Sequence, residues 1–293
     1  MSPKDLLTAT VVIFAWGVNF VVIKLGLHGV PPMLLGALRF ALAAVPVFFV
    51  KRPQIPLRWL FAYGLTISLG QFALLFYAMY VGMPAGLASL VLQAQAFFTL
   101  IFAAMFLGER IRAVNVIGLV IAAAGLALIG MHGGQAMTLT GFLFTLAASA
   151  MWALGNVVTK RMGKVDPLSL VVWASLIPPL PFLALSLNFE GPARIESSLA
   201  AIPLVSVLAV CYLAFVATIV GYSLWGKLLA RYPTAQVAPF SLLVPVIGLA
   251  SAALFLGEAL SPVEFAGAAL VMAGLIVNVF GGRLVQRFLP APR

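Results

Sequence analysis

Ten apolar runs divide this chain, and they constrain its fold more than any other feature. An α-helix needs roughly 17 to 25 apolar residues to cross the hydrocarbon core of a bilayer, and these runs have about that length. The breaks between them are short and rich in Gly, Pro or charge, as in KRPQIP and RMGKVDP. We therefore expect an all-α integral membrane protein with ten transmembrane helices. Because the breaks are short, neighbouring helices should run antiparallel. The predicted spans are residues 6–25, 33–50, 59–80, 85–107, 115–130, 139–159, 168–187, 202–229, 235–256 and 262–280.

The composition agrees with lipid as the solvent. Of the 293 residues, 63% are hydrophobic and only 8% are charged, whereas soluble proteins carry about 25% charged residues. The first run contains Trp16 and Asn19 and lacks a clear cleavage site, so we interpret it as a membrane helix and not as a signal peptide. The single cysteine, Cys211, lies inside an apolar run, so we expect no disulfide.

The basic residues predict the orientation. With the N-terminus inside, 14 of the 17 Lys and Arg fall in cytoplasmic segments, so both termini are predicted to be cytoplasmic. This bias also accounts for the net charge of +10 without a nucleic-acid partner, since nucleic-acid binding needs a basic face beside stacking aromatic residues. The 14 residues are Lys4, Lys51, Arg52, Arg58, Arg110, Arg112, Lys160, Arg161, Lys164, Lys227, Arg231, Arg283, Arg287 and Arg293.

Two pairs of similar segments indicate an internal repeat. WGVNFVVIK (16–24) resembles WALGNVVTK (152–160), and LGERIRAVNVIGLVIAAAG (107–125) resembles LGEALSPVEFAGAALVMAG (256–274). We therefore predict two five-helix repeats, residues 1–134 and 135–293. Five is an odd number of spans, so the second repeat must be inverted, an architecture common in secondary transporters.

These segments, with ALRF in the second span, resemble the EamA branch of the drug/metabolite transporter superfamily, and most of all its YddG-type amino-acid exporters. The resemblance covers essentially the whole chain. It implies a multi-pass protein of the bacterial inner membrane that exports amino acids, including aromatic ones. Related carriers move sugars, nucleotide sugars, drugs or other metabolites, so these remain alternative substrates.

Polar and aromatic side chains that share helical faces are the candidates for the substrate pathway, because polar groups in hydrocarbon need a cavity or a partner. In the fourth span, Gln93 shares a face with Ser89, while Gln95 and Thr99 are predicted to point elsewhere. Each candidate also has a structural alternative, because amides join helices and hydroxyls bond to their own helix. The candidates are Trp16, Asn19, Gln71, Gln93, Trp152, Asn156, Thr218, Tyr222, Trp225 and Ser241.

Charged and small residues near the spans have mainly structural interpretations. Arg39 and Lys24 could attract a substrate carboxylate or gate the pathway, or could instead bond to helix-end carbonyls. Glu109 and Glu258 are expected to complement the N-terminal dipole of the span that follows each of them. A third group, the recurring glycines of 118–125 and 267–274, predicts close helix packing, within the chain or between two copies. Monomer and homodimer therefore both stay open.

The distribution of acidic residues narrows the function. All seven Asp and Glu fall in termini, loops or span ends, which disfavours a proton antiporter for cationic drugs, since such a carrier needs a carboxylate within the membrane. No Walker motif, catalytic constellation or metal-binding spacing is present, so we expect no enzyme activity, catalytic residue, metal or cofactor. We predict a facilitative exporter of small neutral or zwitterionic metabolites that works by alternating access. A nucleotide-sugar carrier and a non-transport membrane assembly protein are the rivals.

Overall fold

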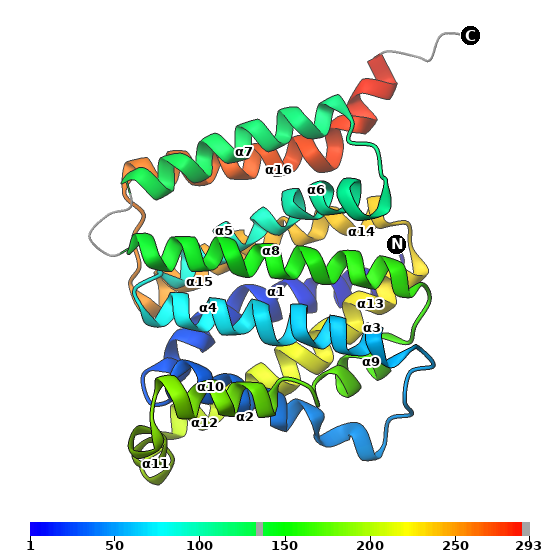
Figure 1. Cartoon of the computed structure of the whole chain (residues 1–293). Helices are drawn as coiled ribbons and strands as arrows, with labels where there is room; N and C mark the ends of the chain where they lie inside the picture. Colours follow the sequence, from blue (N-terminus) through cyan, green and yellow to red (C-terminus); the bar gives the residue numbers. More distant parts are fainter. Residues whose placement is uncertain (133–136, 289–293) are drawn as a thin grey trace.

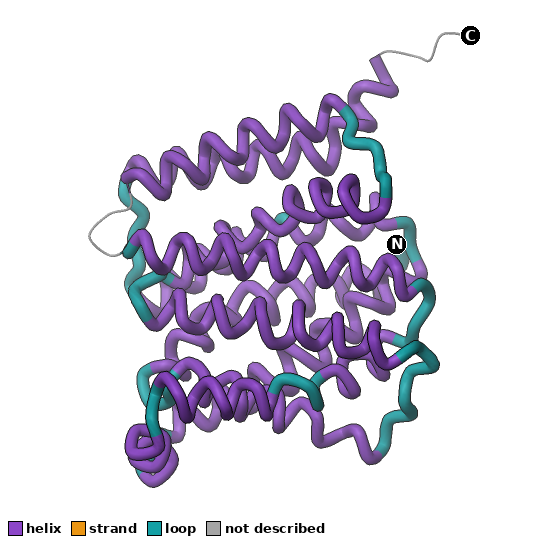
Figure 2. The backbone as a smooth tube through the Cα atoms, in the orientation of Figure 1, coloured by secondary structure: helices purple, strands orange, loops and turns teal. Residues whose placement is uncertain are grey.

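The chain folds entirely into helices and loops over the residues described by the computed structural model, 1–132 and 137–288 (Figure 2). The helices before residue 133 are α1 (Pro3–Leu27), α2 (Pro32–Ala44), η1 (Val45–Phe48), α3 (Leu57–Tyr63), η2 (Gly64–Gly70), α4 (Gln71–Tyr80), α5 (Ala85–Val91), η3 (Leu92–Ala94), α6 (Gln95–Leu107) and α7 (Ala113–His132). The helices after residue 136 are α8 (Leu139–Met162), α9 (Pro167–Ala174), α10 (Pro179–Phe189), α11 (Pro192–Ala200), α12 (Leu204–Cys211), η4 (Tyr212–Val220), α13 (Gly221–Arg231), α14 (Thr234–Ser241), α15 (Leu243–Leu256) and α16 (Pro262–Phe288).

Consecutive helices join into membrane-spanning segments. Within the described residues, nine segments are long and apolar enough to cross a bilayer, and each matches one of the expected spans. The other expected span, 33–50, corresponds to the shorter apolar helix Pro32–Phe48. The boundary expected between the repeats, at 134/135, lies outside the described residues, as does Arg293.

One helix was missed by the sequence reasoning, which treated residues 188–198 as a loop. There, α11 begins at Pro192, directly after Gly191 adopts a φ of 81° that few other residues tolerate. Its polar sequence buries only Ile195, so it carries no apolar run. It lies across one end of the bundle (Figure 1).

Helix irregularities recur at matching places in the two halves of the chain. The third and eighth spans contain π-helical segments, η2 and η4. The fourth span changes pitch at η3, and the ninth is interrupted at Leu242 between α14 and α15. The fourth and ninth spans each end in a left-handed glycine, Gly108 with a φ of 68° and Gly257 with a φ of 67°. π-Helical and 3-10 segments often mark functional sites or hinges.

Glycines bring α7 and α16 into backbone contact. A Cβ on Gly118 would lie 2.7 Å from the Gly274 carbonyl oxygen, and one on Gly125 would lie 2.6 Å from the Gly267 oxygen. The side-chain amide of Asn115 also donates a 2.6 Å hydrogen bond to Asn278 Oδ1. The recurring glycines therefore pack two helices of this chain together (Figure 1), the first of the two alternatives left by the sequence.

The two ends of the bundle differ in charge. We name the end that holds the start of α1 the basic end, and the other the opposite end. In Figure 1 the basic end lies on the right, where α8 ends and α9 begins. The last turn of α16 lies at the same end. Basic side chains there include Lys4, Lys160 and Arg231.

Candidate functional site

An inner cavity of about 360 Å³ lies in the middle of the helix bundle. Such a volume falls at the small end of the range of ligand sites, roughly 300 to 1,000 Å³. Its walls come from α1, α2, α4, α8, α13 and the interrupted fourth and ninth spans. Both halves of the chain therefore contribute to one site.

Four aromatic rings form one wall of this cavity, and Trp16 is at their centre. Its ring centroid lies 6.4 Å from that of Trp152 in an edge-to-face arrangement, 5.1 Å from Tyr222 and 5.5 Å from Trp225. The indole Nε1 of Trp16 donates a 3.0 Å hydrogen bond to the Ala217 carbonyl oxygen in η4, which fixes the ring. This wall offers an apolar surface held in one orientation.

Amides and hydroxyls form a second wall. Asn156 Nδ2 donates to Gln95 Oε1 at 3.0 Å and to Thr99 Oγ1 at 3.1 Å. Gln93 Nε2 approaches the Ser241 carbonyl oxygen at 3.4 Å, where the helix breaks between α14 and α15. The break expected around Ser241 thus frees a backbone acceptor that a side chain uses.

The prediction that Gln95 and Thr99 point away from the pathway is wrong. Both line the inner cavity together with Gln93. Residues two apart on a regular α-helix face different directions. The 3-10 segment η3, at Leu92–Ala94, has fewer residues per turn and alters the phase of the residues that follow it. A uniform helical wheel could not have found these two side chains.

Arg39 is a buried cation beside the cavity. Its side chain is 1% exposed, and its Nε and Nη2 donate to Thr218 Oγ1 at 3.0 and 2.8 Å. The guanidinium carbon lies 3.8 Å from the centroid of the Phe72 ring, a cation–π contact. Thr218 in turn donates to the Leu213 carbonyl, five residues earlier in the π-helical segment η4. The π-helix thus presents the hydroxyl that holds the arginine.

Three buried polar atoms of cavity-lining residues have no hydrogen-bond partner among the described residues: Asn19 Oδ1, Gln71 Oε1 and Arg39 Nη1. The Asn19 side chain is 7% exposed and that of Gln71 is 1% exposed. A buried polar atom without a partner is unfavourable by about 1 to 3 kcal/mol, so few remain unpaired in proteins. Their gathering around one cavity points to a ligand that would satisfy them.

A vestibule of about 720 Å³ adjoins the inner cavity toward the basic end. It shares Trp16, Trp152, Tyr222 and Trp225 with the inner cavity and extends to the loop between α8 and α9, at 163–166, and the start of α9. The vestibule is therefore the route between the aromatic wall and the basic end.

Toward the opposite end, two carboxylates bind helix N-termini. Glu258 accepts hydrogen bonds from the Ala85 and Gly86 amides, both at 2.8 Å, at the start of α5. Glu190 likewise accepts from Met33 and Leu34 at the start of α2, at 2.6 and 3.1 Å. The expectation for Glu258 was therefore wrong, because it caps a helix of the other half of the chain and not the span that follows it.

At the basic end Glu109 also departs from the expectation. It forms a 2.9 Å ion pair with Lys160, and both side chains are about half exposed. Lys24, the residue that matches Lys160 in the first nonapeptide, donates to the Met79 carbonyl oxygen at 3.0 Å near the opposite end. It does not line the cavity.

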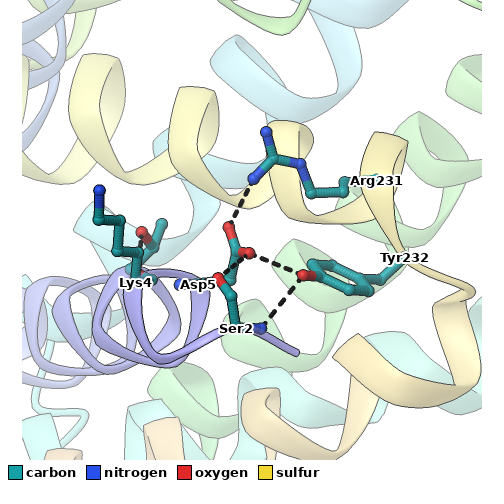
Figure 3. Close-up of polar contacts among 6 residues, drawn as sticks. Ser2, Lys4, Asp5, Arg231 and Tyr232 are labelled. Carbon is teal, nitrogen blue, oxygen red and sulfur yellow. Dashed lines mark hydrogen bonds and ion pairs between the residues drawn. The ribbon is translucent and has the colours of Figure 1, made fainter.

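A polar cluster at the basic end ties α1 to α13 (Figure 3). The Asp5 carboxylate accepts hydrogen bonds from the Tyr232 hydroxyl at 2.7 Å and from Arg231 Nη1 at 3.0 Å. Ser2 Oγ contacts the same carboxylate at 2.5 Å and accepts from the Asp5 amide, which caps α1. This cluster holds the end of α13, which lines the vestibule further along.

Of the predicted pathway residues, nine line the inner cavity and Thr218 lies behind its wall against Arg39. Sequence reasoning did not select Phe72 or Thr159, although both line the cavity too. Phe72 follows Gln71 at the end of a π-helical segment, a feature that no residue pattern revealed. Within residues 1–132 and 137–288, no three His, Cys, Asp or Glu side chains gather as metal ligands. The nine are Trp16, Asn19, Gln71, Gln93, Trp152, Asn156, Tyr222, Trp225 and Ser241.

Membrane-spanning helices around a central polar and aromatic cavity that continues toward one end are the arrangement of a membrane transporter. The family model described as the EamA-like transporter family matches residues 4–131 and again residues 139–280. The chain belongs to the EamA-like transporter family.

Several known proteins resemble it over nearly their whole length. A "Probable amino-acid metabolite efflux pump" of Salmonella typhimurium strain LT2 is 54% identical over 291 residues, which cover 97% of each chain. The protein of the same name in Escherichia coli K12 is 52% identical, with 97% of each chain covered. A "Probable terminal-alkyne amino-acid exporter" of Streptantibioticus cattleyicolor is 28% identical, with 90% of each chain covered.

One solved crystal structure shares the fold. It has a TM-score of 0.66 and 21% sequence identity, and the match covers 99% of this chain and 100% of the other. The apolar helices and the bacterial relatives together make this chain a multi-pass protein of the inner membrane.

Proposed function

We propose that this protein exports amino acids and similar neutral or zwitterionic metabolites across the inner membrane by alternating access. One observation carries the proposal: the cavity joins a rigid aromatic wall to neutral amides and hydroxyls, with Arg39 as its only deeply buried charge among the described residues. Such a lining suits a small molecule that has an apolar side chain and no net charge. The names of the relatives, amino-acid metabolite efflux pumps and an amino-acid exporter, support the same substrate class.

The proposed topology has ten spans in two inverted halves, 1–134 and 135–293, with both termini in the cytoplasm. The helix Pro32–Phe48 serves as the second span, since about 17 residues is the lower limit for crossing. The two matches of one family model support the repeat. So does the glycine contact, in which Gly118 meets Gly274 and Gly125 meets Gly267. This reciprocal pairing is typical of a twofold axis between related surfaces.

In this topology the basic end faces the cytoplasm, and the structure corresponds to the state that loads substrate. The vestibule connects the aromatic wall with the cytoplasmic loop at 163–166. Glu258 and Glu190 hold the outer end closed. Release to the outside requires these contacts to break and new ones to form at the basic end.

The inverted repeat suggests what those new contacts are. Glu109 corresponds to Glu258, and the start of α14 at Thr234 corresponds to the start of α5 at Ala85. We infer that Glu109 leaves Lys160 and caps α14 when the basic end closes, while Glu258 leaves α5. Each glutamate would then exchange one partner in each half-cycle, which keeps the two states close in free energy.

Transport is proposed to be facilitative. Six of the seven Asp and Glu lie at a helix end or in a loop, and Glu196 is exposed on the short helix α11. No carboxylate lines the inner cavity, so it has no acid that would bind a proton in place of substrate. The rival assignment to nucleotide sugars or phosphate esters would require several cations, and Arg39 alone is buried beside this cavity. An enzyme or a non-transport assembly protein is disfavoured because family and relatives are transporters.

Flux in proteoliposomes tests the proposal. Purified protein would be assayed with labelled Phe, Trp, Thr and Met, with and without an imposed pH gradient, beside liposomes without protein. We expect saturable flux that ignores the pH gradient. Flux that follows the gradient would refute the facilitative mechanism, and no flux of any of the four would refute the amino-acid assignment.

A further inference from the structure

We propose that Arg39, Asn19 and Gln71 form the site that binds the charged head of the transported amino acid. Arg39 Nη1 would receive the carboxylate, while Asn19 Oδ1 and Gln71 Oε1 would accept hydrogen bonds from the ammonium group. The inference rests on the proposed function and adds which part of the cavity recognises which part of the substrate.

Only two of the three guanidinium nitrogen atoms of Arg39 form hydrogen bonds with the part of the protein that the structure describes. Its Nε and Nη2 share Thr218 Oγ1 at 3.0 and 2.8 Å, and its face stacks on Phe72. Nη1 carries two further N–H donors, is buried, and has no partner among the described residues. A planar guanidinium held by one edge and one face presents its remaining edge in a fixed direction, which suits a carboxylate.

The charge of Arg39 is also uncompensated. The ion pairs of Lys160 with Glu109 and of Arg231 with Asp5 both lie at the basic end, and no carboxylate lines the cavity beside Arg39. A buried cation without a counter-charge is strongly unfavourable in the membrane interior. The aromatic contact with Phe72 offsets part of this free energy. A substrate carboxylate would supply the missing negative charge.

Asn19 and Gln71 complete the head-group site. An ammonium group has three N–H donors and no acceptor, and the unpaired atom of each amide is its oxygen. Asn19 projects from α1 and Gln71 opens α4, so the ammonium would be held between two helices. Neutral acceptors suit a zwitterion, because the net charge brought into the cavity is then zero.

The lining residues also predict how the substrate lies. Asn19, Arg39 and Gln71 line the inner cavity alone, whereas Trp16, Trp152, Tyr222 and Trp225 line the inner cavity and the vestibule. The head group therefore lies deep in the bundle, and the side chain points toward the vestibule between the aromatic rings. Such a site would select substrates by their amino and carboxylate groups and would accept side chains of several sizes.

A purely structural role for Arg39 predicts a different outcome. If Arg39 only joins α2 to η4 as a structural brace, its hydrogen bonds to Thr218 are sufficient. The brace and the head-group site are separable, because Thr218 accepts from Nε and Nη2 while the proposed carboxylate contact uses Nη1.

Competition by analogues of one substrate tests the site in the unmodified protein. Uptake of labelled L-Phe into proteoliposomes would be inhibited with L-Phe, with L-phenylalaninamide, which lacks the carboxylate, and with 3-phenylpropanoate, which lacks the ammonium. We expect each analogue to compete at least about tenfold less well than L-Phe, since a charge-assisted hydrogen bond is lost in each. If the amide competes as well as L-Phe, the carboxylate contact is refuted. If 3-phenylpropanoate competes as well as L-Phe, the ammonium contact is refuted.

Variants then assign the contact to Arg39. In Arg39→Gln we expect the preference for L-Phe over its amide to fall to about one, whereas Thr218→Val should keep that preference even if flux drops. Arg58→Gln, at an exposed arginine near the basic end, is the matched control and should behave like the parent. A brace alone predicts the same loss of flux in Arg39→Gln and Thr218→Val with the preference intact, which would overturn the proposal.

The outcomes separate this proposal from the one on which it rests. Absence of L-Phe flux in the parent protein refutes the amino-acid function itself, and with it this site. Flux of L-Phe without any preference over its amide leaves the function standing and refutes the site alone. If Arg39→Gln does not elute as a folded, monodisperse protein, the analogue series on the parent protein still decides.

Discussion

The rings of Trp16 and Trp152 meet edge to face with their centroids 6.4 Å apart, although 136 residues separate them in the chain. The two tryptophans open the two similar nonapeptides, so the repeated motif meets itself at the cavity. Edge-to-face pairs contribute roughly 0.5 to 1.5 kcal/mol beyond the apolar area they bury. The contact thus links α1 and α8 as well as lining the pathway.

Removal of one of these rings should affect large substrates most. In Trp152→Ala we expect uptake of labelled Phe and Trp to fall by about tenfold or more, and uptake of Thr to fall less, because the lost surface contacts the side chain and not the head group. Trp59→Ala is the control, since Trp59 does not line the cavity. An equal loss of uptake for all three amino acids would assign Trp152 a purely structural role.

The two glutamates should shift the transport equilibrium in opposite directions. Glu258→Gln weakens the cap on α5 and should favour the state open to the outside, whereas Glu109→Gln should favour the state open to the cytoplasm. A lost cap destabilises a helix by about 0.5 to 2 kcal/mol, which moves such an equilibrium several-fold. A thiol reporter, Ala238→Cys in a Cys211→Ser background, would be labelled with an impermeant reagent from either side. If both variants shift the labelling toward the same side of the membrane, the proposed exchange of glutamate partners is contradicted.

The cluster around Asp5 should stabilise the protein mainly through Tyr232 (Figure 3). The side chain of Arg231 is 68% exposed, so solvent screens its ion pair and Arg231→Gln should change the unfolding temperature little. Tyr232→Phe removes a shorter, less exposed hydrogen bond to a carboxylate and should lower the unfolding temperature more than Arg231→Gln does. Thermal unfolding in detergent measures the unfolding temperature of both variants. A larger decrease in Arg231→Gln than in Tyr232→Phe would show that Arg231, and not Tyr232, is the main stabilising partner of Asp5.

The contact between α7 and α16 should not tolerate side chains. In Gly274→Ala the new Cβ would lie 2.5 Å from the Gly118 carbonyl oxygen, so the helices must separate and the purified protein should unfold at a lower temperature. Ala124→Val, on an exposed face of α7, adds volume to the same helix pair and serves as the control. Similar unfolding temperatures for Gly274→Ala and the parent would show that the helices can move apart freely.

Apolar length and periodicity were sufficient to predict the nine long apolar helices of the described residues, because both follow directly from the order of residues, but they could not reveal the polar helix α11. The sequence selected both Trp16 and Trp152 as pathway candidates, but it did not predict that their rings meet. The side chains of Gln95 and Thr99 could not be placed, since η3 changes the helix pitch and no residue pattern announces it. The partner of Glu258 was equally hidden, because α5 lies far away in the sequence and only the tertiary fold brings it near.

The glycine contact also has a consequence for how such a chain could arise. Gly118 and Gly125 on α7 meet Gly274 and Gly267 on α16, and in the proposed repeat each pair consists of one position and the copy of the other. A surface that fits an inverted copy of itself lets a single five-helix unit pair with a second molecule inserted in the opposite direction. If the proposed repeat arose by duplication and fusion of such a unit, no new interface would have been needed, because the single unit would have paired with its own copy.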